Sequence, residues 1–192
     1  MLEVKTLVVG KISTNCYILY NTETREAAVI DPGAESARIL DAVNEIGATV
    51  KYIFLTHGHF DHVTALDKVR AATGAEAVIH EAEHVKAEGL TKISGGETFA
   101  LSGYTVEAVH TPGHTPGSVC YRVKDMLFTG DTLFEDDCGR CDFPGGDYGM
   151  MLESLRRLAA LEGDYKVCPG HDVSTTLARE RKYNRNMLEA LM

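Results

Sequence analysis

Four side chains that can bind metal ions or carry protons stand within the segment THGHFDH, directly after the apolar run KYIFL. They are His57, His59, Asp61 and His62. Imidazole nitrogen and carboxylate oxygen are both ligands of zinc, and imidazole also suits iron. The paired H-x-H and D-H spacing would let one short loop serve two ions. The segment therefore predicts a metal centre at the end of a buried strand.

Three further candidate ligands follow strand-like runs later in the chain, each beside Gly or Pro. They are His114 in TPGHTPGS, Asp131 in FTGDTLF and His171 in CPGHD. Loops at the C-terminal ends of strands are where a sheet presents side chains to a ligand. Five imidazoles and two carboxylates suit a pair of divalent ions that share a carboxylate and a water. We therefore predict two divalent metal ions, zinc first, with iron or manganese as the alternatives.

The other three histidines, His80, His84 and His110, lie outside this pattern. An isolated histidine is more often a hydrogen-bonded or exposed residue than a ligand, so we expect structural roles for these three.

The elements that must position the candidate ligands alternate between strands and helices. Strands are predicted at EVKTLVV, CYILY, EAAVID, KYIFLT and EAVIH, and later at ETFAL, YTVEAVH, SVCYRV, MLFTG and YKVCPGH. The helix after DPG has an apolar face formed by Ile39, Leu40, Val43 and Ile46, and another helix is predicted over 63–72.

Two helices are predicted in the last third of the chain, one beginning at the N-cap Asp147 and a polar one from about Thr175. Residues 81–96 have the pattern of a helix or loop, and the Gly-, Asp- and Cys-rich segment 131–147 that of a long loop. Long loops of this kind are more often functional than idle.

Composition is typical of a globular protein: of 192 residues, 44% are apolar and 24% charged. No linker divides the chain, so we predict one domain over residues 1–192. The formal net charge of −9 argues against a nucleic-acid partner.

The sequence shows no signal peptide and no apolar run of the ~20 residues that a membrane helix needs. Five cysteines without a secretion signal favour a reducing compartment. We predict a cytoplasmic protein with a small-molecule substrate and no membrane partner; the oligomeric state is not indicated.

The chain resembles the metallo-β-lactamase superfamily over residues 8–172. The resemblance lies in four segments that occur in this order: THGHFDH, TPGHTPGS, GDTLF and PGH. The resemblance implies an α+β fold, a four-layer αββα sandwich. It also implies an assignment of the ligands to two metal ions bridged by one carboxylate. The first site would comprise His57, His59 and His114, the second Asp61, His62 and His171, and the bridge would be Asp131.

Within the superfamily, GDTLFEDDCGRCDFPGGD is most similar to the loop of the glyoxalase II-like group, which hydrolyses thioesters such as S-lactoylglutathione. The resemblance implies attack on the carbonyl by a hydroxide held between the metal ions. Asp61 and Asp131 would then be catalytic, because Asp61 stands close enough to orient the hydroxide. The metal ions would stabilise the developing oxyanion.

Substrate contacts are expected from Arg140, Phe134 and Phe143, although Arg140 could equally form a salt bridge within its loop. In the glyoxalase II family two tyrosines contact glutathione, and Asp142 and Val173 stand at their positions here. Glyoxalase II proper also has a further C-terminal domain that binds glutathione, and we expect none in this chain. A smaller thiol or another acyl carrier could therefore be the leaving group.

Three other functions remain open. The order C-G-R-x-D-F also resembles the persulfide dioxygenases of this fold, in which counterparts of His57, His114 and Asp131 hold one iron. A lactonase is the second alternative, and a non-catalytic metal-binding or redox-sensing module the third. Cys138 and Cys141 form a C-x-x-C pair, which we interpret as two free thiols, with a redox role as the alternative.

One residue outside the motifs has a predicted supporting role. Asp31 belongs to a DPG turn, and we expect its carboxylate to accept a hydrogen bond from a ligand imidazole.

Overall fold

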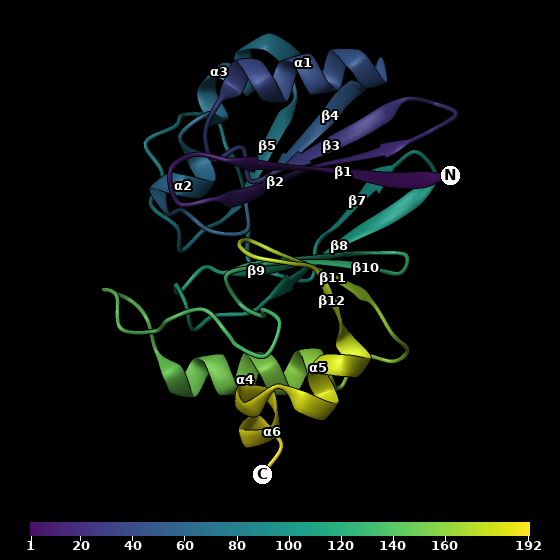
Figure 1. Ribbon diagram of the computed structural model, residues 1–192. Coiled ribbons are helices and arrows are strands. Elements are labelled where there is room, and N and C mark those ends of the chain that lie inside the picture. Colours follow the sequence, from purple (N-terminus) through teal and green to yellow (C-terminus); the bar gives the residue numbers. More distant parts are fainter.

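The computed structural model describes residues 1–192 and contains two six-stranded sheets packed face to face, with helices on both outer sides (Figure 1). The first sheet contains β1 (Leu2–Val9), β2 (Thr14–Asn21), β3 (Glu26–Ile30), β4 (Thr49–Phe54), β5 (Glu76–His80) and β6 (Thr91–Ile93), in that spatial order. The second contains β7 (Thr98–Leu101), β8 (Tyr104–His110), β9 (Val119–Val123), β10 (Met126–Gly130), β11 (Lys166–Pro169) and β12 (Thr175–Thr176). The predicted αββα sandwich is confirmed.

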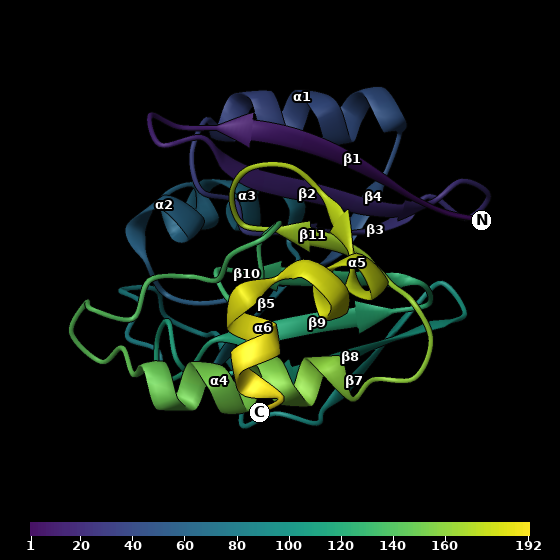
Figure 2. The same cartoon turned by 60° about the horizontal axis from the view of Figure 1, so that its bottom comes forward.

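The helices divide between the two outer faces. The first face is covered by α1 (Ser36–Ile46) and α3 (Leu66–Thr73), with the single turn α2 (Phe60–Val63) nearby. The second face carries α4 (Tyr148–Ala159), α5 (Leu177–Tyr183) and α6 (Arg185–Ala190) (Figure 2). None of these six helices combines the length and apolar character needed to cross a membrane.

The layer between the sheets is the central core, built from alternate residues of the facing strands. Its largest members are aromatic: Phe54 of the first sheet lies 4.7 Å from Tyr121 of the second, measured between ring centroids. Tyr17 meets Phe128 edge to face at 5.2 Å. Separate clusters fill the space beneath α1 and α3 and beneath α4 and α6. The sheets are therefore fixed to each other at their centre, while their ends are free to carry loops.

Parallel strand pairing in both sheets determines where the functional loops emerge. In the first sheet β4 pairs in parallel with β3 and β5, and its C-terminal end continues into Thr56 and His57. In the second sheet β10 and β11 are parallel, and the Gly170 N–H donates to the Gly130 carbonyl at 2.8 Å. Because parallel strands end at the same edge, Asp131 and His171 are brought side by side.

The structure corrects several predicted boundaries. The helix predicted over 63–72 is two helices, α2 and α3, interrupted at Thr64 and Ala65. Residues 81–96 contain no helix, but they include the short edge strand β6. The C-terminal helix is likewise two, because the side chain of Asn184 caps α6 by accepting from the Met187 N–H at 3.1 Å. The long loop over 131–147 is confirmed, as is Asp147 as N-cap of α4.

Candidate metal centre

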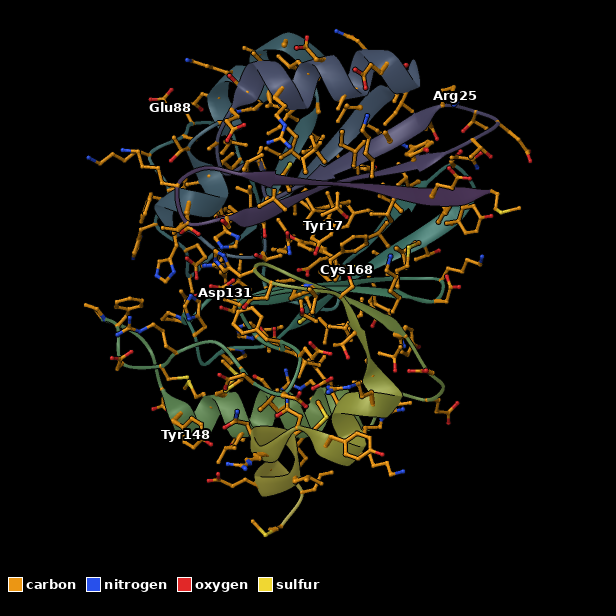
Figure 3. The ribbon with its side chains drawn as sticks, viewed as in Figure 1. Tyr17, Arg25, Glu88, Asp131, Tyr148 and Cys168 are labelled. Atoms are coloured by element: carbon orange, nitrogen blue, oxygen red, sulfur yellow. The ribbon has the colours of Figure 1, made fainter.

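All seven candidate ligands lie together at one edge of the sandwich, between the two sheets. Figure 3 shows Asp131 in this position. The first sheet supplies the loop after β4, and the second supplies the loops after β8, β10 and β11. The seven are His57, His59, Asp61, His62, His114, Asp131 and His171. The ligand atoms of the first group (His57, His59 and His114) lie within 4.8 Å of one another, as do those of the second group (Asp61, His62 and His171).

Three imidazole nitrogens converge in the first group. His59 Nδ1 lies 3.1 Å from His57 Nε2 and 2.9 Å from His114 Nε2. The opposite nitrogens of the other two rings are already engaged: His57 Nδ1 lies 3.1 Å from Thr56 Oγ1, and His114 Nδ1 donates to the Arg140 carbonyl at 2.7 Å. These contacts fix the ring orientation and leave the converging nitrogens free to bind one cation.

The second group is built around Asp61. Its Oδ2 lies 3.2 Å from His62 Nε2 and 3.3 Å from His171 Nε2, and it accepts a hydrogen bond from Thr14 Oγ1 at 2.9 Å. His62 uses its other nitrogen, Nδ1, to donate to Asp31 Oδ2 at 2.9 Å. The predicted hydrogen bond between Asp31 and a candidate ligand is therefore present.

Asp131 stands between the two groups. Its Oδ2 lies 3.4 Å from His114 Nε2 of the first group and 3.6 Å from His171 Nε2 of the second, and its Oδ1 lies 3.4 Å from His62 Nε2. A carboxylate in this position could bridge two cations, as carboxylates do in two-metal hydrolytic sites.

Two orphaned polar atoms test whether this residue set fits a metal. His62 Nε2 and Asp131 Oδ1 are the only buried side-chain nitrogen or oxygen atoms without a hydrogen-bond partner. A buried polar atom left unpaired costs about 1–3 kcal/mol, so native structures rarely tolerate it without a ligand or ion. Both atoms face the same small space, and a cation there would satisfy both. The residues present fit a divalent metal centre.

Burial and neighbouring charges set different protonation states in the two groups. Burial lowers the pKa of His57 well below its ordinary value, so its ring is neutral and able to bind a metal at neutral pH. Burial also opposes the charged form of His62, but the carboxylates of Asp31 and Asp131 outweigh it and raise the pKa of His62 well above its ordinary value. The hydrogen bond to Asp61 raises the pKa of His171. A cation entering the second group must therefore displace protons.

Glu83 connects two of the loops that carry candidate ligands, and nothing in its sequence surroundings marks it. Its side chain is buried in the loop after β5. One carboxylate oxygen accepts from the Gly58 N–H at 2.8 Å, between His57 and His59. The other accepts from Thr115 Oγ1 at 2.5 Å and from the Gly117 N–H at 2.9 Å, next to His114. Glu83 therefore holds the two loops of the first group in register.

Replacement of Glu83 by glutamine is expected to weaken zinc binding to the first group by about 10–100-fold. Glutamine keeps one acceptor oxygen but points an N–H group at the N–H of Gly58 or Gly117, so one of the two loops is released. The measurement is a competition titration of metal-free protein with a zinc chelator, with Glu81→Gln as the matched control on the exposed side of the same loop. Equal zinc affinity in the Glu83→Gln and control proteins would contradict this role.

A cavity of about 770 Å³ opens beside the candidate metal centre. The three predicted substrate residues, Phe134, Arg140 and Phe143, all contribute to its lining. The Phe143 ring lies 5.8 Å from that of His59, and the Phe134 ring lies 6.3 Å from that of His171. One ring therefore lies beside the first group and the other beside the second. The cavity has the size of small-molecule sites in general.

The remaining histidines and the cysteines lie apart from the candidate ligands. His80 and His110 stack on each other at 4.1 Å and contact backbone carbonyls, as expected of structural residues. All five cysteines are free. Cys138 lines the cavity, and burial raises its pKa to about 12, so its thiol is protonated at neutral pH.

Comparison with known proteins is consistent with this geometry. Residues 9–171 match the model of the metallo-beta-lactamase superfamily. The chain is 33% identical to hydroxyacylglutathione hydrolase GloC of Haemophilus influenzae, over 95% of this chain and 97% of that protein. Among solved structures, the BLEG-1 B3 metallo-beta-lactamase has a TM-score of 0.90 at 29% identity, covering 96% of this chain and 99% of that one. ETHE1 from Myxococcus xanthus has a TM-score of 0.87 at 33% identity, covering 95% and 83%.

Proposed function

Because the chain belongs to the metallo-beta-lactamase superfamily, most of whose members are metal-dependent hydrolases, we propose that it hydrolyses small thioesters at a dinuclear metal centre. The observation that carries this proposal is the pair of histidine groups joined by one carboxylate. Asp131 lies within 3.6 Å of nitrogen atoms from both groups, and its Oδ1 and His62 Nε2 are buried without partners. The name of the relative from Haemophilus influenzae supports a thioester as the substrate.

In this proposal the first cation is held by His57, His59 and His114, and the second by Asp61, His62 and His171. Zinc is the proposed metal, because imidazole and carboxylate are its usual ligands in hydrolytic sites. Two cations held by these residues would supply hydroxide near neutral pH by lowering the pKa of a bound water.

The chain's own residues position the reaction. The Asp61 carboxylate, fixed by its hydrogen bond from Thr14, orients the attacking water toward the cavity. Phe134 and Phe143 flank the acyl group and exclude bulk water from the carbonyl. Asp131 keeps the two groups at the separation that the reaction needs. No serine or cysteine nucleophile is required.

Elemental analysis of the untagged protein tests this proposal first. We expect about two zinc, iron or manganese ions per chain, and loss of thioester hydrolysis when a chelator removes them. Return of activity on adding zinc to the stripped protein is the control for chelator damage. A metal-free protein with full activity would contradict the proposal.

A persulfide dioxygenase is the second candidate, favoured by the loop order C-G-R-x-D-F from Cys138 to Phe143 and by the likeness to ETHE1. In that case His57, His114 and Asp131 would hold a single iron, a set of two histidines and one carboxylate that suits ferrous iron. About one iron per chain, with oxygen uptake on a persulfide and no thioester cleavage, would establish this function instead.

Besides a thioester and a persulfide, three further substrates should be tested: an ester, a lactone and a β-lactam. The β-lactam is included because of the likeness to BLEG-1. Turnover of a lactone alone would identify a lactonase. A fully metal-loaded protein that turns over none of these substrates would be a non-catalytic metal-binding module.

A further inference from the structure

The cavity beside the metal centre contains few positive charges. Among its 15 lining residues the only Lys or Arg is Arg140. Asp61 and Asp131 also line it, but these are candidate ligands whose two negative charges would be more than offset by two divalent cations. Two further carboxylates, Asp137 and Asp172, belong to the lining and to neither ligand group. The part of the cavity beyond the metal centre therefore presents more negative than positive charge.

Arg140 is already occupied by a carboxylate from its own loop. Its Nε and Nη2 atoms donate to the two oxygens of Asp142, both at 2.7 Å, which is the bidentate geometry of a matched pair. Its guanidinium also lies 4.0 Å from the centroid of the Phe143 ring. The hydrogen bonds from Arg140 lower the pKa of Asp142 to about 2, so the pair carries no net charge at neutral pH.

The four basic residues of α5 and α6, Arg179, Arg181, Lys182 and Arg185, do not line the cavity. Arg179 pairs with Asp136 and with Glu180, at 2.8 and 2.7 Å. Arg181 donates to the backbone carbonyls of Ala159 and Gly163 at the far end of α4.

The rest of the cavity lining beyond the metal centre is largely apolar. Its apolar side chains are Ile12, Phe60, Phe134, Phe143 and Pro144. Ile12 is 51% exposed and Phe60 is 71% exposed, so both offer surface that a bound molecule can cover.

We propose that this site selects thioesters whose thiol portion carries no carboxylate, and that Asp142 enforces the selection by occupying Arg140. The inference rests on the proposed thioester hydrolase function and names the substrate class within it. A glutathione thioester brings two carboxylates to the cavity. It would meet Asp137 and Asp172 there, while Arg140, the one Lys or Arg of this lining, is engaged by Asp142. A neutral or cationic thiol meets no such repulsion.

The test uses three thioesters with the same acetyl group, carried by glutathione, N-acetylcysteamine and thiocholine. The zinc-loaded full chain is expected to hydrolyse the neutral and cationic thioesters with kcat/KM about tenfold above that of the glutathione thioester. Because the preference arises from charge, it should shrink as salt is added. Release of thiol is followed directly, so one assay serves all three substrates.

Asp142→Asn frees Arg140 and is expected to raise the glutathione to N-acetylcysteamine ratio of kcat/KM about fivefold, through a lower KM for the glutathione thioester. The double variant Asp142→Asn/Arg140→Gln should not show this gain, because the arginine that Asp142→Asn frees is then absent. Asp125→Asn removes the same charge at the exposed turn between β9 and β10, so its ratio should match that of the parent protein. Using a ratio removes differences in folding or metal loading between variants.

The outcomes separate this inference from the function on which it rests. Preference for the glutathione thioester, or a ratio that Asp142→Asn does not move, overturns the role of Asp142 and leaves the thioester hydrolase standing. Failure to hydrolyse any of the three thioesters, in the zinc-, iron- and manganese-loaded protein alike, overturns both.

Discussion

Asp131→Asn is expected to lower kcat for thioester hydrolysis by about 10³-fold or more. Asparagine fills the same volume but carries no charge, so it cannot bridge two cations. The loss of several kcal/mol of electrostatic stabilisation in the transition state corresponds to this factor. The packing should survive because asparagine has the size of aspartate. Space here is tight: a Cβ added at Gly170 would lie only 2.2 Å from Asp131 Oδ1.

The measurement combines steady-state kinetics with metal analysis of the same preparation. We expect fewer metal ions per chain in the variant and a melting temperature close to that of the metal-free parent. Asp125→Asn, which changes the same group far from the site, controls for general effects of charge. Substantial turnover by Asp131→Asn, above a hundredth of the parent value, would refute the bridging role.

Asp31→Ala is expected to lower the free energy of unfolding of the metal-free protein by about 3–5 kcal/mol. Asp31 is buried in the turn after β3, and its carboxylate accepts from the Thr56 N–H at 2.8 Å, from Thr56 Oγ1 at 2.6 Å and from His62 Nδ1 at 2.9 Å. Alanine leaves three buried donors without acceptors. In addition, the backbone at Asp31 has a φ of 49°, a left-handed conformation that alanine adopts poorly.

Urea unfolding of Asp31→Ala and Asp31→Asn at neutral pH measures this loss. Asparagine tolerates the left-handed conformation and keeps one acceptor oxygen, so its loss should be intermediate. A loss below about 1 kcal/mol in the alanine variant would mean that Thr56 and His62 find other partners and that Asp31 does not organise the second group.

The layers follow from the resemblance to the metallo-β-lactamase superfamily. The seven candidate ligands are picked out because they lie in loops after apolar strand-like runs, and the structure brings them together. The sequence does not predict the role of Glu83 in holding two of these loops together. A single acidic residue in a polar loop has no pattern around it, and its partners, Gly58 and Gly117, are distant in the sequence. The sequence leaves open whether Arg140 contacts substrate or forms a salt bridge within its loop, and it does not identify Asp142 as the partner, because residues two apart in a loop meet only if the backbone turns. Nor does the sequence predict the break at Thr64 and Ala65, because the apolar pattern continues through it.

The N-terminal hairpin meets the last strand of the parallel pair, and this contact bears on when the metal centre can form. The Asn15 side chain donates to the carbonyls of Pro169 and Asp172, and the Tyr17 hydroxyl donates to that of Pro169 at 2.6 Å. These pairs are 152–157 residues apart along the chain. Closing so long a loop is slow, so we expect the edge that carries the ligands to assemble late in folding. A refolding chain would then capture its full complement of metal only in the final step, and excess metal ions would meet the early histidines before their partners arrive.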